Sequence, residues 1–124
     1  MEQLLVTYED VKNELGQDLA TLRGESPNEI NIWLRKQQNK ILDFIGSCAF
    51  GGAWTVDRYL QDQTAVAIIR KAILRQIDYK IEIKFVDTDR IVHRDGEAYY
   101  PDIDENARKL LENSGLLYTG KFRK

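Results

Sequence analysis

The sequence predicts a mainly α-helical protein, a small helical bundle of about four helices with a short β-hairpin over residues 90–100 and an extended C-terminal tail. Three observations support this prediction. Capping residues precede several segments, apolar residues recur in them at helical spacing, and one Asp-Gly dipeptide separates two β-prone runs. The 124 residues suffice for one domain with one core. We assign residues 1–115 to a single helical domain and residues 116–124 to the tail.

Composition and charge narrow the class of protein. The chain is 43% hydrophobic and 31% charged, which is typical of a folded, soluble domain. Its 18 basic and 20 acidic residues give a net charge of −2, which argues against a dedicated nucleic-acid binder. No signal peptide is expected at the start, and no apolar run is long enough to span a membrane. The sequence therefore predicts a protein that is made and used in a reducing cytoplasm, or that leaves the cell by another route.

The first predicted helix is short. Thr7 is the expected N-cap, Asp10 follows three residues later, and Gly16 supplies the stop. Residues 17–25 are expected to form a packed loop with room for one helical turn. The apolar face of the helix carries Tyr8, Val11 and Leu15.

The second predicted helix has the strongest start signal in the chain. Ser26, Pro27 and Glu29 form a capping box with proline at the first helical position. Gly46 is expected to close this helix, and residues 47–55 to form a flexible turn. Its apolar face carries Ile30, Trp33, Leu34, Ile41, Phe44 and Ile45, and its opposite face carries Arg35, Lys36 and Lys40.

The third predicted helix is the longest, starting at Val56 or Asp62 and running to Tyr79. It is apolar on more than one side, which predicts a central helix or a subunit interface. Over residues 79–86 apolar and charged residues alternate, so the segment is either a strand or a continuation of the helix. We favour the helix because no breaker intervenes.

A hairpin and a last helix complete the prediction. Asp95 and Gly96 suit a two-residue turn between the strands of the hairpin. The last helix is expected to start at Asp102, with Glu105 at its third position, and to end at residues 114–115.

No catalytic constellation is visible. Cys48 is the only cysteine and His93 the only histidine of the sequence, so neither a disulfide within the chain nor a clustered metal site is expected. Cys48 is expected to act as a small buried hydrophobe. Gly51 and Gly52 lack the rest of a phosphate-binding loop. The sequence thus predicts no enzyme and no cofactor.

Two sets of residues are candidates for contacts with other molecules. Three basic residues of the third helix either form a solvated face or line a channel through which DNA passes without base readout; they are Arg70, Lys71 and Arg75. Apolar residues of the tail, set among basic ones, either dock on another chain or fold back on the bundle. The docking candidates are Leu116, Leu117, Tyr118, Phe122 and Arg123.

Three segments carry a resemblance to a known family. They are TYEDVKNEL near the start, NEINIWLRKQQNKILDFIG in the second helix and ARKLLENSGLLYTG near the end. In this order, around a long central helix, they resemble the head–tail connector, or adaptor, proteins of tailed bacteriophages. Residues 84–100 depart from the resemblance.

The resemblance implies a structural virion protein. Such subunits form a ring, usually of twelve copies, beneath the portal, where the ring extends the DNA channel and presents a docking surface to the next neck protein, the stopper. The C-terminal segment commonly grips the portal, which here implies residues 115–124. The alternative from another class is a small DNA-binding regulator of the helix-turn-helix type, built on the turn at residues 47–55.

Overall fold

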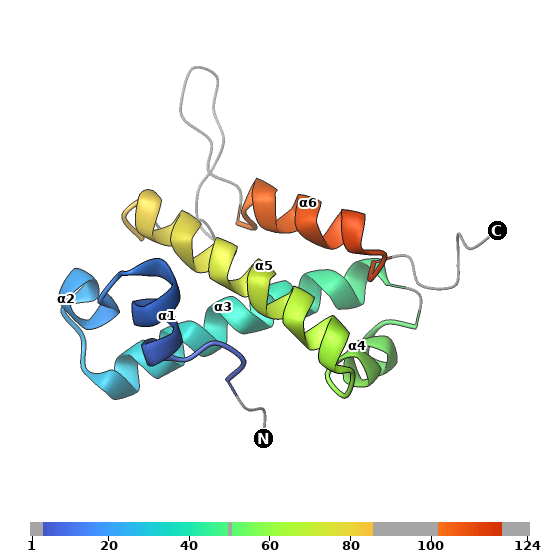
Figure 1. Cartoon of the computed structure of the whole chain (residues 1–124), viewed down its shortest axis with the longest axis horizontal. Helices are drawn as coiled ribbons and strands as arrows, with labels where there is room; N and C mark the ends of the chain where they lie inside the picture. The colour runs from blue at the N-terminus through green and yellow to red at the C-terminus, as the bar shows by residue number, and fades with distance from the viewer. Residues whose placement is uncertain (1–3, 50, 86–101, 118–124) are drawn as a thin grey trace, which may run out of the picture.

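The computed structural model describes residues 4–49, 51–85 and 102–117, and these form six helices without a strand (Figure 1). The mainly helical class is confirmed, but the expected number of about four helices is wrong. Two short helices lie where a loop and a flexible turn were expected. The hairpin predicted over residues 90–100 lies outside the described residues. The helices are α1 (Tyr8–Leu15), α2 (Leu19–Arg23), α3 (Pro27–Cys48), α4 (Ala53–Tyr59), α5 (Gln63–Glu82) and α6 (Glu105–Ser114).

The predicted N-cap Thr7 and the predicted capping box at Ser26 are confirmed, and Thr7 also belongs to a capping box. At the start of α1, the Thr7 hydroxyl accepts the Asp10 amide at 3.2 Å, and the Asp10 carboxylate accepts the Thr7 amide at 3.0 Å. At the start of α3, Ser26 and Glu29 exchange the same pair of bonds at 3.4 and 2.9 Å. These bonds satisfy backbone amides that have no partner within the helix.

Gly46 does not close α3, which continues to Cys48. A Cβ on Gly46 would lie 3.5 Å from Cγ2 of Val56, an ordinary van der Waals distance, so Gly46 lies where α4 packs against α3. The turn between these helices uses Gly51 and Gly52 at positive φ. A Cβ on Gly51 would lie 2.4 Å from Oγ1 of Thr55, which leaves room only for glycine there.

The helical alternative for the segment after Asp78 is confirmed as far as Glu82. α5 begins after its N-cap Asp62 and ends only when Lys84 and Phe85 adopt positive φ angles of 59° and 61°. Lys80 explains why the sequence pattern was ambiguous. Its side chain is buried at a core position of α5, where an apolar residue would have completed the helical period.

α6 starts later than expected. Its N-cap is Asp104, whose carboxylate accepts the Ala107 amide at 3.1 Å, rather than Asp102. Gln76 of α5 holds the residues before α6, since its side chain donates to the Asp102 carbonyl and accepts the Asp104 amide, both at 2.8 Å. This buried amide therefore fixes the position at which α6 begins.

The long helices α3 and α5 cross at the centre of the molecule, and α6 lies along α5 (Figure 1). α1 and α2 lie beside the N-terminal half of α3, and α4 folds back against its C-terminal part. The core between these helices consists mainly of isoleucine and leucine; its largest fully buried apolar side chains are Leu19, Ile30, Leu34, Ile41, Ile45, Ile69, Ile73, Ile77, Leu111 and Leu117.

Candidate interaction surface

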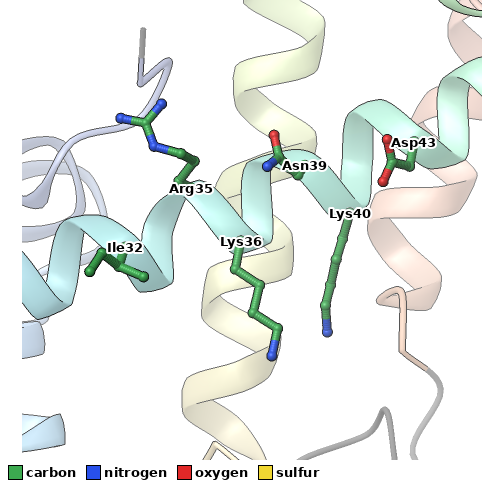
Figure 2. Close-up of a pocket in the computed structure, with 6 residues that line it drawn as sticks. All are labelled: Ile32, Arg35, Lys36, Asn39, Lys40 and Asp43. Atoms are coloured by element: carbon green, nitrogen blue, oxygen red, sulfur yellow. The ribbon is translucent and has the colours of Figure 1, made fainter. Parts of the chain in front are cut away.

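An open groove of about 420 Å³ runs along the outer face of α3. Lys36 and Lys40 extend from one side of the helix, and Arg35, Asn39 and Asp43 extend from the other (Figure 2). Ile32 stands at the N-terminal end of the groove. We call these six residues the α3 groove.

A second hollow of about 320 Å³ lies between α3 and α4 and shares Asn39 and Asp43 with the α3 groove. On the α4 side it is lined by Ala53, Val56 and Asp57. We call it the α3–α4 pocket. The two hollows adjoin, and the charge of their lining changes along α3 from basic at Arg35 and Lys36 to acidic at Asp43 and Asp57.

The first turn of α4 projects a large aromatic side chain into solvent. Trp54 is 65% exposed, and the guanidinium carbon of Arg58 lies 4.9 Å from its ring centroid. Trp54 and Arg58 are four residues apart and therefore share one side of α4. We call this pair the α4 knob. Tryptophan and arginine are the residue types most enriched at the energetic centres of protein interfaces.

Sequence reasoning missed both of the most exposed large apolar side chains among the described residues, Trp54 and Ile32. Ile32 is 71% exposed. The available signal was its position two residues after the buried Ile30, about 200° around a helix of 3.6 residues per turn and so outside the apolar face. Trp54 had no such signal, because the helix that carries it was not predicted.

The basic face of α3 is less solvated than its sequence suggests. The Lys40 ammonium lies 2.6 Å from the Asp102 carboxylate, and the buried ammonium of Lys80 lies 3.7 Å from the same oxygen. Asp102 thus joins α3 to α5 beside the start of α6. Lys40 serves this junction, and Arg35 and Lys36 are the other basic residues that line the α3 groove.

Arg70 is partly exposed, and its guanidinium is engaged by other parts of the chain. Its Nε donates to the Leu5 carbonyl at 2.8 Å, and its Nη2 lies 2.9 Å from Glu14 and 3.4 Å from Asp10. The Leu5 amide in turn donates to the Gln38 side chain at 2.7 Å. Arg70 therefore ties the N-terminal segment and α1 to α5, contrary to the expectation of a solvated or channel-lining side chain.

Lys71 and Arg75 lie exposed one turn apart on α5. Their placement separates them from Arg70, so the predicted basic stripe is reduced to two residues. Arg75 also lines a small hollow of about 70 Å³ with Asp78, Tyr79 and Glu82 of α5 and with Asp104 and Asn106 near the start of α6. Acidic neighbours there weaken the positive field that a DNA-facing residue would need.

Two of the predicted docking residues belong to the core. Leu116 is 9% exposed and Leu117 is fully buried, and the Tyr59 hydroxyl of α4 donates to the Leu116 carbonyl at 2.5 Å. The expectation that these two side chains are exposed is wrong, because the chain turns at Gly115 and brings them against the bundle. The folded unit therefore extends through Leu117 rather than ending at residue 115. Tyr118, Phe122 and Arg123 lie outside the described residues, and their docking role stays a prediction.

Perturbed carboxyl groups of the described chain have structural causes. The pKa of Asp10 is lowered, first by the Thr7 amide and further by Arg70. The pKa of Asp18 is lowered chiefly because it accepts a hydrogen bond from the Tyr8 hydroxyl at 2.6 Å, and the same bond raises the pKa of Tyr8. These groups cap helices and join α1 to α2.

The other candidates for catalysis or metal binding do not form a cluster among the described residues. Cys48 is half-buried rather than fully buried, with its sulfur 3.8 Å from the Ser47 hydroxyl. His93 lies outside the described residues. Among the residues that the structure does describe, no three histidine, cysteine or acidic side chains are grouped to hold a metal ion. Within the same ranges, no helix has the length and apolar character to cross a membrane.

The main features of the described surface are thus the α3 groove, the α3–α4 pocket and the α4 knob. The hydrogen bonds and ion pairs of Arg70, Gln76 and Asp102 hold the helices in place. Comparisons with protein families, with curated proteins and with solved structures give no match for this chain.

Proposed function

We propose that the chain is a structural, non-enzymatic subunit of a tailed-phage neck. Copies form a ring, of twelve subunits in the virion, beneath the portal, where the ring extends the DNA channel and links head to tail. Its partners are the portal protein, the stopper that follows it in the neck, and packaged DNA that passes without sequence readout. The protein resides in the host cytoplasm before assembly and in the virion afterwards, and it uses no cofactor.

The observation that carries this proposal is that a small helical subunit presents an exposed Trp54 on one face and two open hollows on another. Large exposed apolar groups rimmed by charged ones are typical of protein interaction sites. The three sequence segments that resemble phage connectors indicate which assembly such a subunit serves.

A helix-turn-helix regulator is the weaker candidate. A recognition helix must present one free face to the major groove of DNA. α5 contacts α1, α3, α4 and α6, and it buries residues on several sides, including Ala72, Ile73 and Leu74 in succession. α4 has only seven residues. Neither of the two helices that follow the turn therefore suits insertion into DNA.

The direct test is binding to the portal protein of the same phage. We expect the full chain to bind purified portal rings, and a chain lacking residues 118–124 to bind them at least tenfold more weakly. The shortened chain keeps all six helices and both buried leucines, so we expect it to melt at the same temperature. A Lys109→Glu variant, altered at an exposed position of α6, is the matched control and should bind normally.

Two results would refute the proposal. One is a full chain that does not bind portal rings in pull-down or electron microscopy. The other is a stable dimer that binds duplex DNA tightly, with the steep loss of affinity in salt that phosphate contacts produce. The second result would favour the regulator.

A further inference from the structure

We propose that the α3 groove and the adjoining α3–α4 pocket bind the α4 knob of a second copy of this chain. The contact joins the aromatic knob of one subunit to the outer face of α3 of the next. This inference rests on the proposed function and deepens it, because it names the surfaces through which neighbouring subunits meet.

The apolar parts of the two surfaces match. Trp54 and Ile32 are the described chain's two most exposed large apolar side chains, at 65% and 71%. One is a protruding ring and the other borders an open groove. Covering both in a single contact removes the largest exposed apolar groups of each described surface from water, which is the main driving force for association.

The charges of the two surfaces are complementary. Arg58 of the knob is exposed, and its guanidinium lies over the face of Trp54. Asp43 and Asp57 are exposed, and neither takes part in an ion pair within the described part of the chain. Arg58 placed beside these carboxylates gains attraction. The charges therefore favour seating Arg58 at the end of the groove that carries Asp43.

The knob cannot fill the groove of its own chain. Ala53, Val56 and Asp57 line the α3–α4 pocket, whereas Trp54 lies about 100° further around α4 from Ala53 at 3.6 residues per turn. Knob and groove thus occupy different faces of one subunit. A contact between different faces is heterologous and repeats from copy to copy, so it generates a ring when the rotation closes.

A charge exchange tests the contact. Arg58→Asp and Asp43→Arg are made separately and together, and mass is followed by sedimentation velocity over a concentration series. We expect the wild-type chain to associate beyond a dimer, each single variant to stay monomeric, and the double variant to regain association. An equimolar mixture of the two single variants should also associate beyond a dimer, because the unchanged knob of one variant meets the unchanged groove of the other and the two reversed charges meet at the next contact.

Trp54→Ala tests the apolar part of the contact, with Leu22→Ala, at another exposed apolar position, as control. We expect Trp54→Ala to raise the dissociation constant about tenfold or more, the usual effect of removing a central interface residue. A wild-type chain that stays monomeric at every concentration, or association that the variants do not weaken, overturns the inference. A closed wild-type dimer also overturns it. Portal binding by residues 118–124 is measured separately, so none of these results by itself decides the proposed function.

Discussion

Replacing Leu117 with alanine tests whether the end of the described chain is part of the core. Leu117 is fully buried, and the turn that positions it is held by the Tyr59 bond to the Leu116 carbonyl. Leucine-to-alanine changes in protein cores cost about 2–5 kcal/mol, from lost burial and from the cavity that is left. For a domain of this size we expect the melting temperature to fall by roughly 8–20 °C, at about 4 °C per kcal/mol.

The assay is urea unfolding followed by far-UV circular dichroism, with thermal melts alongside. Leu22→Ala is the matched control, because Leu22 is 45% exposed and the same chemical change should cost less than about 1 kcal/mol there. A Leu117→Ala variant that loses no more stability than this control would refute the assignment of Leu117 to the core. It would return that residue to the set of free docking side chains.

Three further changes have expected outcomes. Ser26→Ala removes the cap of α3 and should lower the free energy of unfolding by about 1 kcal/mol in thermal melts; an unchanged midpoint would contradict the observed cap. Asp10 has a folded pKa below 3.8, so its stabilising effect is present above that pH and is lost as the pH falls through the lower folded value. Asp10→Asn should therefore be less stable than wild type at neutral pH and should converge with it in acid, as urea titrations across pH would show; a constant difference would contradict the linkage. Lys84→Gly should relieve left-handed strain and raise stability by up to about 1 kcal/mol, and a loss in the melting temperature would show that Lys84 has another role.

Local signals in the sequence predicted the helix starts well. Ser26 and Glu29 bind backbone amides three residues apart, so the sequence alone contains the whole motif. The start of α4 lacked such a signal because its N-cap, Gly52, has no side chain to make the bond. Gly51 and Gly52 suggested a flexible turn. In the structure, Gly51 instead allows Thr55 to approach the backbone closely.

The candidate surface depends on contacts between distant residues, which the sequence pattern does not contain. Leu117 is as apolar as an exposed docking residue would be, and only the turn at Gly115 decides that it is buried. Arg70 reads as part of a basic stripe, yet its partners lie 56 and 65 residues away. Asp102 was assigned to a helix start, and its carboxylate instead lies beside Lys40, 62 positions earlier.

The attachment of Leu5 has a consequence for the order in which the protein forms during translation. Its amide donates a hydrogen bond to Gln38, which is synthesised 33 residues later, and its carbonyl accepts one from Arg70, which is synthesised 65 residues later. The segment around Leu5 is made before both partners and is therefore not fully anchored until Arg70, in the first half of α5, has emerged. Contacts with such long sequence separation slow folding, because the chain must close a large loop before they form. A nascent chain stopped before residue 70 should consequently be open to proteases at its N-terminus, and one extended past α5 should be protected.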